Sequence, residues 1–180
     1  MNDLGTITLE SDRLILRRFR LDDAEDMYKN WATDPLCNRY LEWNLHKNVE
    51  ETRDLISMWI KEYDDNSYNW IVELKNTHEV IGSITGVHIH KSDLNVEIGY
   101  CYGSKYWGNG YATEALKRVI SFFLNDCHMH LVEAMHISGN PGSGRVMEKA
   151  GMQKEAVLKD RRINKYTKEL NDLVIYSIIK

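Results

Sequence analysis

The sequence lacks the features that mark several classes of protein. Its 180 residues include 2 prolines and 3 cysteines, and no apolar run approaches the roughly 20 residues that a membrane-spanning helix needs. We see no Pro- or Ser/Gly-rich linker, repeat or low-complexity tract, so we predict a single domain over residues 1–180. The three cysteines, Cys37, Cys101 and Cys127, are few, odd in number and widely spaced, which favours reduced thiols over a disulfide framework.

An excess of basic residues is also missing. The net charge is −4, whereas a nucleic-acid-binding surface usually carries a positive excess. Residues 1–6 show neither the basic nor the apolar segment of a signal peptide. We therefore expect a cytoplasmic protein without a membrane or nucleic-acid partner. The apolar fraction of 43% and the charged fraction of 28% are typical of a globular domain.

Hydrophobic periodicity predicts a mixed α/β fold with the element order β-α-α-β-β-β-α-β-α-β-β. Asp22 and Glu25 have the spacing of a capping box at the first helix, and Thr33-Asp34-Pro35 is expected to end it. Asn140 and Pro141 are suited to start the last helix, and Gly151 to end it. The predicted strands span residues 14–19, 70–74, 80–87, 96–102, 131–137, 155–158 and 172–179, and the helices 22–31, 49–63, 112–123 and 140–150.

The glycine-bearing turn between residues 102 and 112 is the feature most indicative of function. Gly108 and Gly110 allow backbone angles that a Cβ would forbid, and the helix that follows directs unpaired N–H groups and a positive dipole end at one point. Such a point suits an anion. A P-loop would need Gly-Lys-Ser/Thr, but Gly110 is followed by Tyr111-Ala112. A Rossmann fingerprint would need a third Gly or Ala where Thr113 stands, and an acidic residue after the next strand. An ordinary strand–turn–helix corner is the remaining alternative.

Four segments in order resemble the GCN5-related N-acetyltransferases, in particular the branch that acetylates ribosomal-protein N-termini. The turn fits the Gln/Arg-x-x-Gly-x-Gly/Ala pattern of that family, with Lys105 in the first position, and Met152 replaces the usual Phe. The resemblance covers nearly the whole chain and rests on Leu14-x-Leu16-Arg17-x-Phe19-x-x-x-Asp23-Ala24, Lys105-Tyr106-Trp107-Gly108-Asn109-Gly110-Tyr111-Ala112-Thr113-Glu114-Ala115, Asn140-x-x-Ser143-x-Arg145-Val146-x-Glu148-Lys149-x-Gly151 and Asp172-x-x-x-Tyr176-Ser177.

The resemblance implies a mixed, mostly antiparallel sheet that splays between strands 96–102 and 131–137, the fourth and fifth predicted strands. Acetyl-CoA, the implied cosubstrate, would lie in this gap, and a backbone amide near Tyr100 would polarise the thioester carbonyl. Backbone groups of Cys101 and Tyr102, together with Asn140 and Ser143, would hold the pantetheine. The remaining implied cofactor contacts are Lys105, Trp107, Gly108, Asn109, Gly110, Tyr111, Ala112 and Thr113 at the pyrophosphate, and Lys149 near a phosphate.

Glu97 is the candidate general base. Strand alternation places it with Gly99 and Cys101, next to the expected thioester site, where it could act through one water. A solvent-facing strand carboxylate is the alternative. Ser143 could protonate the leaving thiolate, or serve only as a polar residue in the first helical turn. The predicted reaction is direct acetyl transfer in a ternary complex to a primary amine, either a protein N-terminus or a small molecule.

Several alternatives stay open. A CoA-binding regulatory module could keep the cleft without turnover, and the final strand could pair across a homodimer. Residues 20–66, the implied acceptor side, hold twelve acidic and six basic residues, which suits a cationic amine but equally a solvated helix pair. The pairs His88/His90 and His128/His130 lack further ligands at a recognised spacing, so no metal site is predicted. Cys101 has no histidine partner in sequence, so a strand thiol is favoured over a nucleophile.

Overall fold

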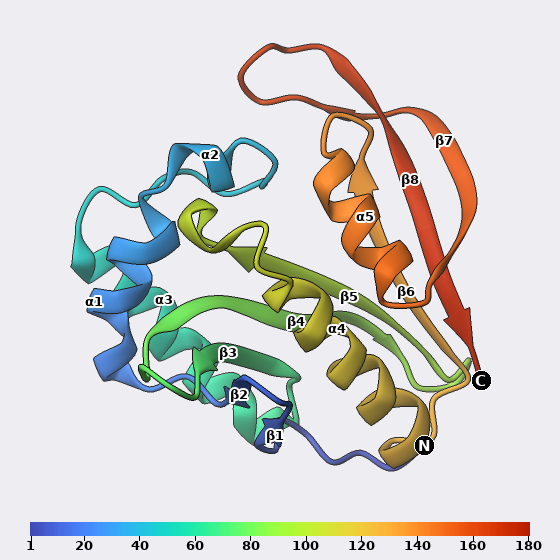
Figure 1. Ribbon diagram of the computed structural model, residues 1–180, viewed down its shortest axis with the longest axis horizontal. Coiled ribbons are helices and arrows are strands. Elements are labelled where there is room, and N and C mark those ends of the chain that lie inside the picture. Colours follow the sequence, from blue (N-terminus) through green and yellow to red (C-terminus); the bar gives the residue numbers. More distant parts are fainter.

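The computed structural model describes residues 1–180, and all eight strands lie in one sheet (Figure 1). The strand order is β1-β2-β3-β4-β5-β6-β8-β7. Every neighbouring pair is antiparallel except β5 and β6, which are parallel. The mixed, mostly antiparallel sheet is therefore confirmed. The strands are β1 (Leu9–Glu10), β2 (Leu14–Arg17), β3 (Asn69–Leu74), β4 (Val80–His90), β5 (Asn95–Tyr102), β6 (Leu131–Ile137), β7 (Gln153–Ile163) and β8 (Leu170–Ile179).

Five helices flank the sheet, and they cover both of its faces. In Figure 1, α4 lies in front of the strands and α3 lies behind them. None of the helices combines the length and the apolar character that a membrane-spanning segment needs. The helices are α1 (Ala24–Met27), which continues as a wider π-turn over Tyr28–Ala32, α2 (Pro35–Asn38), α3 (Val49–Glu62), α4 (Tyr111–Ser121), which continues as a π-turn over Phe122–Asp126, and α5 (Pro141–Lys149).

Two hydrophobic cores form, one on each face of the sheet. The larger core of 29 buried residues packs α4 and α5 against the sheet, and the smaller one of 9 packs α1 and α3 against it. Alternation along β5 contributes to both. Val96 and Ile98 are buried in the larger core, whereas Cys101 packs against the smaller. The faces predicted for this strand are confirmed.

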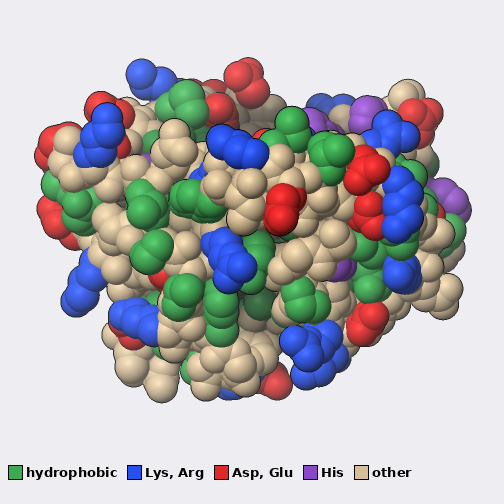
Figure 2. All heavy atoms as spheres, turned by 90° about the horizontal axis from the view of Figure 1, so that it is seen from above, with side chains coloured by type: hydrophobic (Ala, Val, Ile, Leu, Met, Phe, Trp, Pro, Cys, Tyr) green, Lys and Arg blue, Asp and Glu red, His purple; other side chains and the backbone are tan.

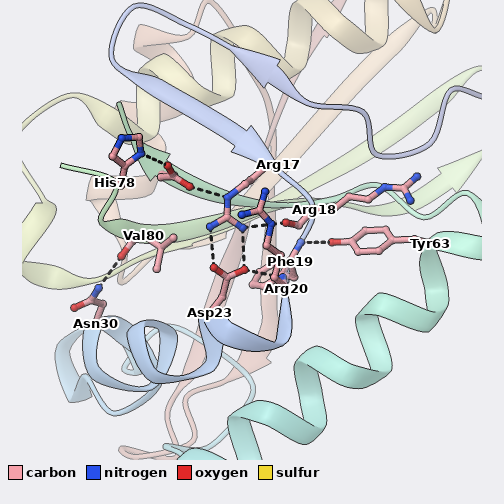
Figure 3. A network of polar contacts seen from close by, with 10 residues as sticks. Arg17, Arg18, Phe19, Arg20, Asp23, Asn30, Tyr63, His78 and Val80 are labelled. Carbon is pink, nitrogen blue, oxygen red and sulfur yellow. Dashed lines mark hydrogen bonds and ion pairs between the residues drawn. The ribbon is translucent and has the colours of Figure 1, made fainter. Parts of the chain in front are cut away.

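A buried ion-pair network fastens the first helical segment to the sheet (Figure 3). The Arg17 guanidinium donates to both carboxylate oxygens of Asp23, at 2.8 and 2.9 Å, and to Glu73 at 2.7 Å. Glu73 also contacts His78 Nδ1 at 2.7 Å. Burial alone would raise the pKa of Glu73, but the hydrogen bonds from His78 and Arg17 hold it below its usual value. Figure 3 also shows the Asn30 amide, which donates to the Val80 carbonyl at 2.7 Å.

Local predictions near the first helix were partly wrong. The capping carboxylate is Asp23, whose Oδ2 accepts from Arg20 N at 2.6 Å, not the predicted pair of Asp22 and Glu25. Thr33-Asp34-Pro35 does end the helical segment, but Asp34 then caps α2 by accepting from Leu36 N at 2.9 Å. The short elements α2 and β1 were not predicted. β4 and β7 also extend beyond their predicted ends, because strand pairing continues past the apolar residues.

Candidate active site

The predicted splay of the sheet is confirmed between β5 and β6. These strands pair only at Asn95–Leu131, Val96–Val132 and Glu97–Glu133. Beyond Glu97 the two strands separate (Figure 1). From there to its end at Ile137, β6 pairs with β8 alone. The C-terminal half of β5 therefore has a strand partner, β4, on one side only.

The register of β4 and β5 decides which backbone groups face the gap. Gly103 N donates to Ile81 O at 3.1 Å. Hydrogen-bonded pairs alternate along an antiparallel ladder, so the backbone of Cys101 faces β4, whereas Tyr100 and Tyr102 turn their N–H and C=O groups toward the gap. Tyr102 O already accepts from the Trp107 indole at 2.8 Å. The backbone of Tyr102 thus faces the gap, whereas that of Cys101 faces β4, so this register does not fit the expected backbone contacts of Cys101 with a ligand in the gap.

The glycine turn ends in an open helix N-terminus beside this gap. Gly108 and Gly110 both have φ of +81°, a region that strongly favours glycine. Gly110 is the N-cap of α4 and supplies no capping side chain. The first hydrogen bond of the helix runs from Glu114 N to Gly110 O at 3.0 Å, so the N–H groups of residues 111–113 precede it. They form a site suited to an anion.

Two side chains next to this turn are held by carboxylates. Lys105 Nζ contacts Glu79 Oε1 at 3.0 Å, so this lysine is paired with the β3–β4 connection. Arg13, which the sequence analysis missed, binds Glu114 at 2.7 Å and donates to Asn109 O at 3.1 Å. Arg13 therefore braces the turn from the β1–β2 connection. About a hundred residues separate it from the turn, and no local pattern indicates the contact.

The N-terminus of α5 faces β5 across the splay. Asn140 caps this helix as predicted, with Oδ1 accepting from Ser143 N at 3.3 Å. The Tyr100 hydroxyl lies 2.8 Å from Ser143 Oγ and 3.0 Å from Ser143 O. Burial raises the pKa of Tyr100, so the phenol keeps its proton. Lys149 is exposed at the other end of α5.

Glu97 lies where β5 parts from β6, on the sheet face opposite Tyr100. Its neighbours in register are His88 on β4 and Glu133 on β6. Partial burial raises the pKa of Glu97, and the negative charge of Glu133 raises it further, while His88 opposes the shift. A carboxyl group with a raised pKa at the point where two strands separate is a candidate proton acceptor.

α2 and the β7–β8 loop contact each other. Lys165 Nζ and the Tyr166 hydroxyl each lie 2.6 Å from Asn38 Oδ1. Arg162 and Glu42 form an ion pair at 2.8 Å. In Figure 1 the loop reaches toward α2. Figure 2, which looks onto this end, shows hydrophobic side chains interspersed with charged side chains of both signs.

The other residues singled out in the sequence have mainly structural surroundings. In the segment 20–66, which the sequence analysis considered for the acceptor, the aromatic side chains of Trp31 and Tyr63 are buried. Cys101 Sγ has no histidine partner and lies 3.0 Å from Cys37 Sγ. No group of three or more potential metal ligands occurs in the structure.

Comparisons with known proteins concern the family and the fold. A family model described as an acetyltransferase (GNAT) domain matches residues 13–153. The uncharacterized N-acetyltransferase p20 of Bacillus licheniformis is 31% identical over 176 residues, 96% of each chain. The ribosomal protein uS5-alanine N-acetyltransferase of Escherichia coli is 33% identical over 83 residues, which cover 46% of this chain and 43% of that protein.

Solved structures share the fold. A GNAT-family acetyltransferase from Bacillus anthracis superposes with a TM-score of 0.84 at 26% identity, covering 96% of this chain and 98% of that one. RimL, a ribosomal L7/L12 alpha-N-protein acetyltransferase in complex with coenzyme A, has a TM-score of 0.81 at 17% identity, covering 96% of this chain and 98% of its own. The second similarity concerns the fold alone.

Proposed function

The chain belongs to the GNAT acetyltransferase family, and we propose that it transfers the acetyl group of acetyl-CoA directly to a primary amine within a ternary complex. One observation carries the proposal. β5 parts from β6 beside the uncapped N-terminus of α4, so strand-edge hydrogen-bonding groups and an anion site occur together. A pantetheine arm and a pyrophosphate need that combination.

The cofactor would be held mainly by backbone groups. The pyrophosphate would accept from the amides between Lys105 and Thr113, where the two glycines give the turn its shape. The pantetheine amides would pair with Tyr100 and Tyr102, whose backbone groups face the gap, and with Asn140. In this arrangement the Tyr100 N–H is the candidate donor to the thioester oxygen. Removing such a donor typically costs about 3 kcal/mol of transition-state stabilisation.

Glu97 would accept the proton that the amine loses when it attacks. Its raised pKa supports this role, because a base works best when its pKa approaches the operating pH. An α-amino group, with a pKa of about 8, needs little help near neutrality, whereas a lysine, at about 10.4, needs much more. Ser143 would donate at the sulfur of the leaving thiolate.

We infer that the acceptor is the N-terminal amine of a protein or a small-molecule amine. The name of the E. coli relative supports the first class. The second class is suggested by the name of a structural neighbour at 20% identity. That neighbour is the microcin C7 self-immunity acetyltransferase MccE in complex with acetyl-CoA and AMP.

Three measurements test the proposal. In thermal-shift titrations, acetyl-CoA and CoA should raise the melting temperature and NAD should not, because a ligand at a hundred times its Kd stabilises by about 2.7 kcal/mol. An acceptor screen with peptide N-termini and small amines should then detect release of CoA.

Glu97→Gln should lower the rate of acetyl transfer at least tenfold and leave the affinity for the cofactor unchanged. A chain that binds CoA but acetylates no amine would instead be a CoA-binding regulatory module.

A further inference from the structure

We propose that the Tyr100 phenol is a positioning residue that orients the Ser143 hydroxyl toward the sulfur of bound CoA, so that the two hydroxyls form a chain stabilising the departing thiolate. This inference rests on the proposed function, because it needs the CoA thiol to lie at the N-terminus of α5. It assigns to the Tyr100 side chain a role distinct from that of its backbone N–H.

The geometry offers the Tyr100 proton two acceptors. The phenol oxygen lies 3.0 Å from Ser143 O and 2.8 Å from Ser143 Oγ. When the phenol donates to the carbonyl, the serine hydroxyl can donate to the phenol oxygen. When the phenol donates to Oγ, the serine proton is free to turn to another acceptor. The change between the two arrangements keeps each hydroxyl in a hydrogen bond.

The surroundings hold both partners in place. The Tyr100 ring packs against the larger core, with its centroid 6.3 Å from that of Tyr102. Ser143 N is held by the cap at Asn140. Because burial raises the pKa of Tyr100 and the phenol stays neutral, it acts as a donor and does not become a phenolate.

The chemistry balances without a proton leaving either hydroxyl. The amine nitrogen forms a bond to the thioester carbon, the C–S bond breaks, and its electron pair leaves on sulfur. The amine proton goes to Glu97. A serine hydroxyl is far less acidic than a thiol, so Ser143 donates a hydrogen bond to the thiolate and keeps its proton. Solvent protonates the sulfur after release.

The test measures affinity for the thiolate and needs no acceptor. Calorimetric Kd values are measured for CoA and for desulfo-CoA, which lacks the sulfur, below and above the ordinary thiol pKa of about 8.5. The variants are Tyr100→Phe and Ser143→Ala. Tyr176→Phe is the matched control, because the Tyr176 hydroxyl also links a strand to α5, by donating to Glu148 at 2.9 Å, but does not contact Ser143.

The wild-type protein and Tyr176→Phe should prefer CoA over desulfo-CoA about tenfold more at high pH than at low pH, as expected for a hydrogen bond to a charged group. Tyr100→Phe and Ser143→Ala should lose this pH-dependent preference and bind desulfo-CoA as the wild type does. A preference retained in Tyr100→Phe, or absent from the wild type, would overturn the inference and leave the cofactor assignment standing. Failure of the wild type to bind either molecule would overturn the proposed function as well.

Discussion

Replacing Glu133 by Gln should raise the activity of the enzyme relative to the wild type at acidic pH. Glu133 on β6 pairs with Glu97 on β5, and this is the last residue pair between the two strands. The negative charge of Glu133 helps to raise the pKa of Glu97. Removing that charge lowers the pKa of Glu97, so the proposed base stays ionised at lower pH.

The magnitude follows from the spacing. Neighbouring strands lie about 5 Å apart, so we take the two carboxylates as roughly 6 Å apart. Both groups are partly exposed, and an effective dielectric constant of roughly 40 to 80 gives about 0.7 to 1.4 kcal/mol of repulsion. This repulsion corresponds to about half to one pKa unit. At a pH below the pKa of Glu97, the ratio of the variant's rate to the wild-type rate should therefore be about three- to tenfold higher than it is at neutral pH.

The assay is the ratio of kcat/KM for Glu133→Gln to that of the wild type, measured against pH with one acceptor amine. The ionisation of the amine is the same in both reactions and cancels in the ratio. The ratio should rise as the pH falls through the pKa of Glu97, and then level off. Glu148→Gln removes an equal charge on α5, where it contacts Tyr176, and its ratio should stay flat. A flat ratio for Glu133→Gln would refute the reasoning.

Three further predictions concern the scaffold of the site. Gly110→Ala should raise the Kd for CoA about tenfold and lower the melting temperature by a few degrees, because alanine in the left-handed region costs roughly 1–2 kcal/mol; calorimetry and thermal denaturation measure both, and an unchanged Kd would contradict the turn assignment. Asp23→Asn should cost about 2–3 kcal/mol in the free energy of unfolding, measured in urea, because it weakens a buried ion pair; a loss below 0.5 kcal/mol would show that the network is unimportant. Oxidation with diamide should join Cys37 to Cys101, whose sulfurs lie 3.0 Å apart, and leave Cys127 reduced; peptide mapping by mass spectrometry would reveal any other pairing.

Local chemistry made the centre of the fold predictable. The helix after the glycine turn follows from apolar spacing, and the turn itself needs glycine at two positions with φ of +81°. The cap at Asn140 and the end of α5 at Gly151, with φ of +97°, likewise each follow from the type of one residue. These features depend on neighbours in sequence.

Other features depend on contacts between distant segments, and the sequence could not reveal them. The Tyr100 phenol meets Ser143 only because β5 and α5 come together across the splay. The choice of Asp23 over Asp22 as the cap is decided by Arg17, which already binds that carboxylate. The direction of the Cys101 backbone depends on its register with β4, and one residue of shift would reverse it.

The short pairing between β5 and β6 divides the sheet into two parts. Five strands stand on one side of it and three on the other, yet only three residue pairs cross it. Few sheet hydrogen bonds therefore join the two parts. Within each part the strands are held by longer ladders, such as β4–β5 and β6–β8. Beyond Glu97 and Glu133, the spacing between the two parts is therefore set by side-chain packing, including the contact of Tyr100 with Ser143, and not by strand pairing.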